Sequence, residues 1–105
     1  MKDFHIQKTM AKRKAINEYP VGQYILDALK ERGMSQAELA AKTTVSTPVI
    51  NDIIKCRRPA SAIQLVKFGL VLGLDAIEMG RMQSDYEIMQ VINTLFEKNE
   101  ETEQS

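Results

Sequence analysis

The sequence predicts an all-α fold of five helices that continues into a C-terminal helical extension. From residue 20 onwards, apolar residues recur three and four positions apart, the spacing that places them on one face of a helix. Two segments, Ser35 to Glu38 and Ser61 to Gln64, have the Ser-x-x-Glu/Gln pattern of a capping box, which opens a helix. The same region has no useful run of alternating apolar and polar residues, so we expect no β-strand there.

The composition limits the class of protein. A chain of 105 residues has room for one domain with one core. No apolar run approaches about 18 residues and the N-terminus lacks the apolar stretch of a signal sequence, so we expect a cytoplasmic protein without a membrane span. Cys56 and His5 are the only residues of their types and offer no ligand cluster, so we expect no metal and no other cofactor.

The net charge is zero, but the charges are unevenly distributed. Residues 1–19 contain five basic and two acidic side chains, whereas residues 84–105 contain one basic and six acidic ones. We therefore divide the chain into a basic N-terminal arm at 1–19, a helical domain at 20–83, and a C-terminal helical extension with an acidic tail at 84–105. The simpler explanation of the charge at either end is a solvated terminus with no binding role. We adopt this explanation for the last eight residues.

The first predicted helix covers residues 21–32. Pro20 precedes it, where a helix start tolerates proline, and Gly33 follows it as a stop signal. Its apolar residues lie at helical spacing: Val21, Tyr24, Ile25, Ala28 and Leu29.

Residues 34–53, MSQAELAAKTTVSTPVINDI, predict two short helices joined by a tight turn. Leu39 and Ala40 face inward in the first helix, and the small Ala40 lets the second helix approach closely. Val45 fills the corner between the helices, and Ser46 caps the second one. The second helix is therefore held rigidly against the first.

The second helix of this pair has two distinct faces. Ile50 and Ile53 lie three residues apart and share the inner face. Polar side chains point the other way, and they are Thr47, Asn51, Asp52 and Lys55. A braced helix with a short polar outer face suits the major groove of DNA, whereas the simpler alternative is a plain helical hairpin inside an all-α domain.

Two further helices are predicted after this pair. Ser61 and Gln64 open a helix that stops near Gly73 and contains Ala62, Leu65, Val66, Phe68, Leu70 and Leu72. Asp75 with Glu78 resembles a third cap, and the apolar stripe that follows it begins with Met79 and Met82, which we assign to the core. This stripe predicts either one long amphipathic helix or two helices with a weak point at Gly80.

The segment from residue 36 to residue 53 resembles the helix-turn-helix of the phage-repressor-like (Xre) family. The matching positions are Gln36, Ala37, Glu38, Leu39, Ala40, Val45, Ser46, Ile50 and Ile53. The resemblance implies a phage-repressor-like, five-helix DNA-binding domain. Two positions depart from the family pattern: Thr44 stands where the turn usually has glycine, and Thr43 stands where an apolar residue is common. A threonine is strained if the turn needs a positive φ.

Two other segments are similar to HigA-type antitoxins, and the resemblance extends from about Pro20 to Met89. Residues 51–58, NDIIKCRR, resemble the end of the recognition helix and the paired basic residues after it, with Cys56 where many relatives have glycine. Residues 82–87, MQSDYE, are similar to the segment that follows the repressor-like core. HigA-type proteins neutralise a RelE-like mRNA-cleaving toxin and bind their own operator as dimers, so the resemblance implies both partners for this chain.

Eight residues are candidates for contacts with double-stranded operator DNA: Gln36, Ser46, Thr47, Pro48, Asn51, Lys55, Arg57 and Arg58. Asn51 is the best candidate for a base contact, because its amide can form two hydrogen bonds with adenine. Gln36 and the three basic residues suit phosphates. Asp52 can accept a hydrogen bond from cytosine or repel the DNA backbone. A solvated helix surface is the alternative for Asn51, and a solvated loop is the alternative for Arg57 and Arg58. Because this outer face has no arginine, we expect tight binding only by a homodimer spanning two half-sites.

The C-terminal stripe predicts an interface with a second copy or another protein. Its candidate residues are Tyr86, Ile88, Met89, Ile92, Leu95 and Phe96. One small domain cannot bury such a stripe along its full length, and exposed apolar patches of that size mark partner surfaces. The arm at 1–19 combines basic and apolar residues, so we hypothesise that it folds on the toxin or on DNA, the alternative being a frayed tail.

Other classes of function fit the sequence less well. An enzyme is disfavoured because His5 and Cys56 have no catalytic partner nearby and no phosphate-binding glycine loop is present, so we expect no small-molecule substrate. A stand-alone Xre-type regulator without a toxin is the main alternative. A protein-binding module that no longer reads DNA is a third, favoured by Asp52, Thr43 and Thr44.

Overall fold

The structure, a computed structural model, describes residues 19–104, and within that range it contains five helices and no strand. The helices are α2 (Val21–Arg32), α3 (Gln36–Thr43), α4 (Thr47–Ile54), α5 (Ala62–Leu72) and α6 (Ala76–Gln104). The all-α prediction is confirmed. Helix α2 has the predicted bounds, the predicted capping residues Ser35, Ser46 and Ser61 precede α3, α4 and α5, and α5 ends before Gly73 as predicted. The N-terminal arm lies outside the described residues except for Tyr19.

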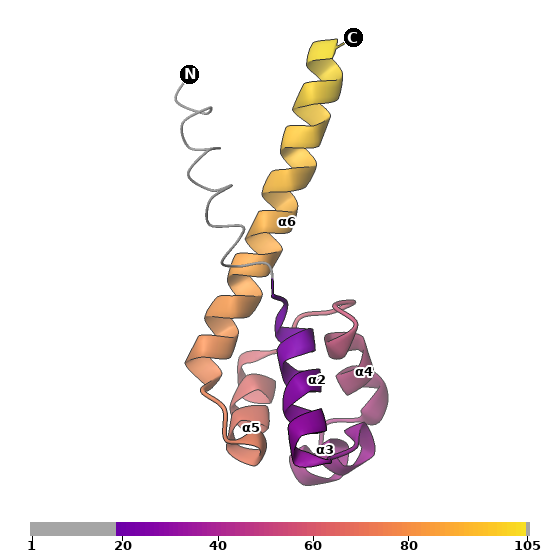
Figure 1. Cartoon of the computed structure of the whole chain (residues 1–105), viewed down its shortest axis with the longest axis vertical. Coiled ribbons are helices and arrows are strands. Elements are labelled where there is room, and N and C mark those ends of the chain that lie inside the picture. Colours follow the sequence, from indigo (N-terminus) through magenta and orange to yellow (C-terminus); the bar gives the residue numbers. More distant parts are fainter. Residues whose placement is uncertain (1–18, 105) are drawn as a thin grey trace.

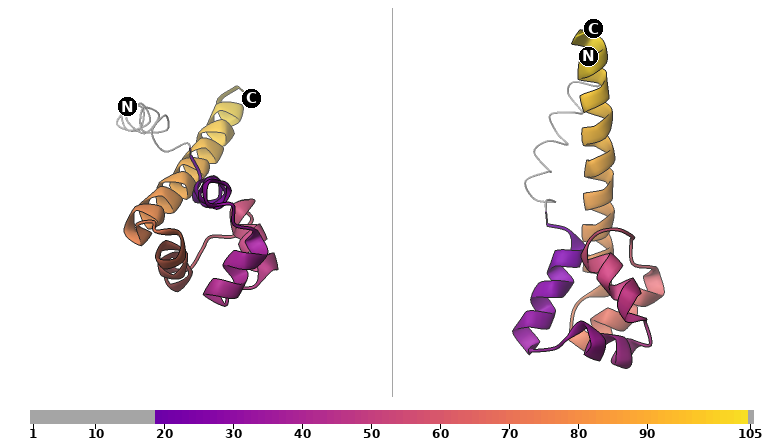
Figure 2. Two further views of the ribbon diagram at one scale, coloured as in Figure 1. Left: turned by 60° about the horizontal axis from the view of Figure 1, so that its bottom comes forward. Right: turned by 90° about the vertical axis from the view of Figure 1, so that its right-hand side faces the viewer.

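The helices form a small body from which α6 projects as a long rod (Figure 1). Helices α2 to α5 and the first turns of α6 surround one core, and the rest of α6 extends well beyond it, so that the molecule measures 52 × 24 × 22 Å. Helix α5 packs against α3 and α6, whereas α2 packs against α4 and α6. Figure 2 gives two further views of this arrangement. None of the helices in the described range is both long enough and apolar enough to cross a membrane.

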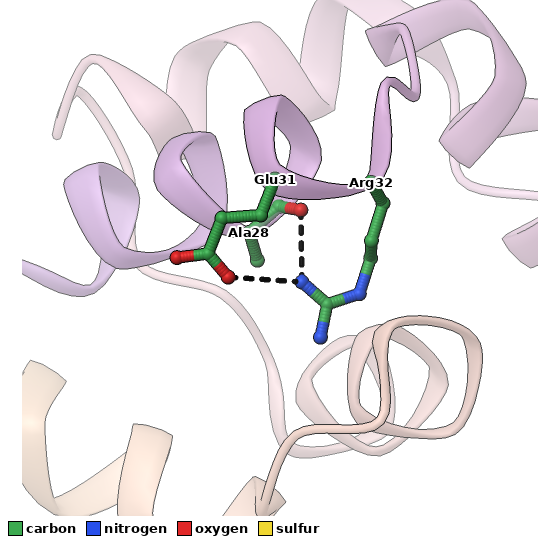
Figure 3. A network of polar contacts seen from close by, with 3 residues as sticks. All are labelled: Ala28, Glu31 and Arg32. Carbon is green, nitrogen blue, oxygen red and sulfur yellow. Dashed lines mark hydrogen bonds and ion pairs between the residues drawn. The ribbon is translucent and has the colours of Figure 1, made fainter.

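Helix α2 ends in a left-handed turn, as its Gly33 predicted. Gly33 has φ 59°, and the Met34 N–H donates to the carbonyl of Leu29 at 2.9 Å. The guanidinium of Arg32 folds back and donates to the carbonyl of Ala28 at 2.9 Å, beside the carboxylate of Glu31 (Figure 3). A cation at this end also complements the helix dipole.

Both predicted capping boxes are present. The Ser35 hydroxyl accepts from the Glu38 N–H and the Glu38 carboxylate accepts from the Ser35 N–H. Ser61 and Gln64 make the same reciprocal pair at the start of α5. Asp75 caps α6 in a simpler way, with one carboxylate oxygen accepting from two backbone N–H groups of the first turn.

The core lies where α2, α3, α4, α5 and the start of α6 meet. Its fully buried side chains are Ile25, Leu29, Leu39, Ile50, Ile53, Phe68, Leu72 and Met79. Met82 packs against this cluster while partly exposed, so the assignment of Met79 and Met82 to the core is confirmed. Three of the apolar residues expected in α5, Ala62, Val66 and Leu70, are exposed, as is Ile63 beside them.

Helix α6 is continuous through Gly80, which decides between the two alternatives that the sequence left open. It also crosses residue 83, so the fifth helix of the body and the C-terminal extension are one element. A single glycine in a helix costs about 1 kcal/mol relative to alanine, whereas burial of Met79 and Met82 on either side of it favours the helix by more than that.

Candidate nucleic-acid interface

Helix α4 has the two faces that its sequence predicts. Ile50 and Ile53 are buried in the core, while Thr47, Pro48 and Lys55 are exposed. Asn51 and Asp52 lie half-buried between them, on the outer side. The helix therefore presents a polar ridge to solvent and is fixed from beneath by two aliphatic side chains.

The start of α4 is fixed by a side-chain cap. The Ser46 hydroxyl accepts from the Val49 N–H at 3.4 Å, and Pro48 lies in the first turn, where its missing N–H is not needed. Ser46 was a candidate DNA contact, and its hydroxyl is engaged in holding the helix start. The groups left facing outward at this end are the side chains of Thr47 and Pro48.

The turn between α3 and α4 tolerates its two unusual threonines for different reasons. Thr44 adopts the left-handed conformation with φ 59°, so it stands in the strained conformation that a glycine would relieve. Its hydroxyl accepts from the Lys67 ammonium of α5 at 3.1 Å. Thr43 is buried, and its hydroxyl donates to the Leu39 carbonyl at 2.6 Å and accepts from the Val45 N–H at 3.3 Å. A polar side chain is thus accommodated in an apolar position because its hydrogen bonds are satisfied.

The residue at the end of α4 adopts a left-handed backbone, the conformation that glycine takes most easily. Cys56 has φ 61°, its N–H donates to the Ile53 carbonyl, and the Arg57 N–H donates to the Asp52 carbonyl at 2.8 Å. Cysteine therefore fills a left-handed position at an expected cost of about 1 kcal/mol or more. Desolvation raises the pKa of the Cys56 thiol, so this thiol is a poorer nucleophile than an ordinary cysteine.

Asp52 forms an ion pair that was not predicted from the sequence. Its carboxylate lies 3.5 Å from the guanidinium of Arg57, and both groups are partly exposed. Part of its negative charge is therefore screened from an approaching phosphate. Arg57 and Arg58 remain exposed in the loop after α4, and Gln36 lies half-buried at the first position of α3.

A side chain of α6 holds this basic loop in place. The Gln83 amide donates to the Ala60 carbonyl at 2.9 Å and accepts from the Ala60 N–H at 2.8 Å. Ala60 is buried, so its backbone groups need these partners. The segment containing Gln83 stands out in the sequence by resemblance, but nothing there indicates this contact between residues 23 positions apart.

Replacing Gln83 by leucine, which has a similar size and no amide, is expected to reduce the free energy of unfolding by about 1–3 kcal/mol. The buried N–H and carbonyl of Ala60 would lose their partners. Urea denaturation followed by circular dichroism measures the change. Gln90→Leu is the control, because Gln90 is an exposed glutamine of the same helix. Equal effects of the two substitutions would contradict the role of this hydrogen-bond pair.

The residues expected at a partner interface divide between two faces of α6. Ile88 and Leu95 are exposed and share a face with Val91, which was not among the predicted interface residues. Tyr86, Ile92 and Phe96 are half-buried. Met89, which we expected on the exposed stripe, is instead buried, because it lies about 100° around the helix from Ile88. We call Ile88, Val91 and Leu95 the α6 stripe.

The structure offers little for other kinds of chemistry. Among the residues it describes, no group of three or more His, Cys, Asp or Glu side chains is arranged to hold a metal ion. The candidate site is the exposed polar surface of α4 and of the loop after it.

Comparison with known proteins gives a family match that includes α3 and α4. A family model described as helix-turn-helix matches residues 25–81, slightly more than half of the chain. The matched range begins within α2, includes α3, α4 and α5, and ends in the first turns of α6. No curated protein and no solved structure matches the chain.

Proposed function

Because the chain belongs to the helix-turn-helix family of DNA-binding regulators, we propose that it is an operator-binding repressor that acts as the antitoxin of a toxin–antitoxin pair. The observation that supports the DNA-reading part most strongly is the outward polar face of α4. It stands on a helix whose start is capped and whose inner face is locked into the core. A helix in that state needs little reordering to enter a major groove.

In the proposed complex, the residues of this face have different roles. Thr47 and Asn51 read base edges, and Asn51 pairs with adenine through its amide. Lys55, Arg57 and Arg58 contact phosphates together with Gln36. Ser46 and Pro48 act indirectly, by fixing the start of α4. Asp52 orients Arg57 through its ion pair.

Replacing Asn51 by alanine is expected to weaken binding to the preferred DNA site by about 10-fold to 100-fold, because one bidentate hydrogen-bonded contact to a base is lost. The site is first obtained by selection from random duplex DNA with the unaltered protein, and affinities are then measured by fluorescence anisotropy at fixed salt. Specificity at the contacted base pair should also relax, because the lost amide is what distinguishes adenine.

Two comparisons control this experiment. Asn93→Ala removes a half-buried amide of α6 and should leave DNA affinity unchanged. Arg58→Ala should weaken binding to all sequences alike and reduce the dependence on salt by about one charge. If Asn51→Ala binds the selected site as tightly as the unaltered protein, α4 does not read bases through this residue.

The antitoxin part of the proposal is supported by the similarity of residues 51–58 and 82–87 to HigA-type antitoxins. The proposed partner is a RelE-like mRNA-cleaving toxin encoded beside this protein, and the proposed operator lies upstream of the same operon. Co-expression with the neighbouring reading frame tests it. A stable complex, suppressed toxicity and binding to the upstream fragment support the antitoxin. Binding to that fragment with no toxic neighbour supports the alternative, a stand-alone regulator.

A further inference from the structure

A cavity lies behind the basic loop, between the end of α4, the first residues of α2 and the middle of α6. Its volume is about 370 Å³. Small-molecule sites typically fall between about 300 and 1,000 Å³ and are lined by apolar surface with a few polar groups. The cavity is therefore large enough for a small organic ligand. It is also the place where the DNA-reading unit meets the projecting helix.

The floor and walls of the cavity are mainly apolar. Val21 and Ile53, which belong to the core, contribute to it, and Pro20, Pro59 and Val91 complete the apolar lining. Val91 is largely exposed although it belongs to a helix that packs on the body. An apolar surface recessed in this way gains free energy when the body of a ligand displaces water from it.

The polar lining contains two arginines and one carboxylate, and the Arg57 guanidinium also lies 3.5 Å from the carboxylate of Asp52. Arg57 and Arg58 line the cavity from the loop, and Glu87 is the acidic residue that lines it from α6. Guanidinium groups bind carboxylates through paired, charge-assisted hydrogen bonds. The loop that contains both arginines is held by Gln83, itself a lining residue, so the cationic wall has a defined position relative to α6.

We propose that this cavity binds a small organic carboxylate with an apolar body, and that the bound ligand weakens DNA binding. The apolar part occupies the floor, and the carboxylate pairs with Arg58 and with Arg57, whose guanidinium it shares with Asp52. The second half of the inference rests on the proposed function, in which the same two arginines contact phosphates. A carboxylate held by these guanidinium groups competes with the DNA backbone for them.

Cys56 provides a direct measure of occupancy, because it lines the cavity and is the only cysteine of the chain. The probes are straight-chain carboxylates from butyrate to decanoate and the aryl carboxylates phenylacetate and 4-phenylbutyrate, each compared with its neutral amide. Alkylation of the full chain by iodoacetamide is followed by mass spectrometry. A bound carboxylate should slow alkylation about tenfold at a concentration about ten times its Kd, and the matching amide should protect far less.

Variants assign the protection to the cavity. The double variant R57Q/R58Q should lose it, while R81Q should keep it, because Arg81 is exposed on α6 and does not line the cavity. The melting temperatures of the unliganded variants show that each remains folded. If none of the carboxylates protects Cys56 saturably, or if R57Q/R58Q is protected as well as the unaltered chain, the site is disproved.

The regulatory half is tested separately with the most protective carboxylate. DNA affinity should fall as occupancy rises, and the effect should vanish in R57Q/R58Q. Protection of Cys56 without any change in DNA affinity would overturn the regulatory half and support the site alone. If the unliganded protein binds no DNA, the proposed function fails, and the protection experiment still decides whether the cavity binds carboxylates.

Discussion

Replacing Gly22 by alanine is expected to destabilise the protein by about 3 kcal/mol, the upper end of the usual cost of overpacking. Gly22 lies inside α2 at the point where that helix crosses the end of α4. A Cβ atom at this position would overlap the carbonyl oxygen of Ile54 and lie 2.5 Å from that of Ile53. Both obstacles are backbone atoms, so no side chain can rotate away to make room.

The consequence of this substitution extends to the DNA-reading surface. To admit the methyl group, α2 and α4 must separate, and α4 would move relative to α3 and the core. In a domain of this size, a loss of about 3 kcal/mol lowers the melting temperature by about 12–24 °C. Thermal and urea denaturation by circular dichroism measure the loss, and DNA affinity below the melting temperature measures the displacement of α4.

Gly80→Ala is the matched control and should have the opposite sign. Gly80 is also inside a helix, but a Cβ atom there would meet only a methyl group of Leu65 at 3.8 Å, an ordinary van der Waals contact. Alanine is a better helix former than glycine, so this variant should gain about 0.5–1 kcal/mol. If Gly22→Ala is also neutral or stabilising, the close approach of α2 and α4 is not a feature of the folded protein.

These two glycines show what periodicity can and cannot predict. The spacing of apolar residues predicts α2 and its ends, but it contains nothing about the distance between α2 and α4, so the importance of Gly22 is invisible in the sequence. Gly80 is conspicuous in the sequence as a possible break. It is harmless in the structure, because the side chains around it anchor the helix to the body.

The same distinction holds for the candidate site. The two faces of α4 follow from the helical period alone, which is why the sequence is sufficient to assign Ile50 and Ile53 to the inner face and Asn51 to the outer one. Contacts between distant residues are not predictable in this way. The hydrogen bonds of Gln83 with Ala60 depend on how the helices pack. The same is true of the contact between α5 and the α3–α4 turn, and of the cavity behind the basic loop.

We propose that the chain forms a homodimer through the α6 stripe, and the double variant I88D/L95D is expected to convert this dimer into a monomer. Ile88, Val91 and Leu95 are 52%, 58% and 54% exposed, although each is a large aliphatic residue. They lie three and four residues apart, the spacing at which two helices pack along a seam. Two aspartates in that seam would place unpaired charges in a buried interface and so destabilise the dimer. They would change the folding stability of the monomer little, because the replaced side chains are exposed there.

Sedimentation at micromolar concentration measures the oligomeric state. Circular dichroism should show that monomeric I88D/L95D melts at almost the same temperature as the unaltered protein diluted until it is monomeric. The matched control is I63D/L70D on α5, whose targets are 65% and 81% exposed. The two variants remove similar apolar area and add the same charge. If I63D/L70D dissociates the dimer and I88D/L95D does not, the exposed face of α5 is the interface and the α6 stripe is not.

Loss of the dimer should weaken operator binding more than loss of any single contact to DNA. A dimer engages its second half-site at a high effective concentration, and such coupling raises the overall affinity by about 10²–10⁴. The monomeric I88D/L95D variant should therefore bind a full operator at least about 100-fold more weakly than the unaltered protein, yet bind an isolated half-site with the same affinity. If it also loses the half-site, the substitutions have disturbed α4 itself; if it keeps full-operator affinity, the two DNA-reading helices are not coupled through α6.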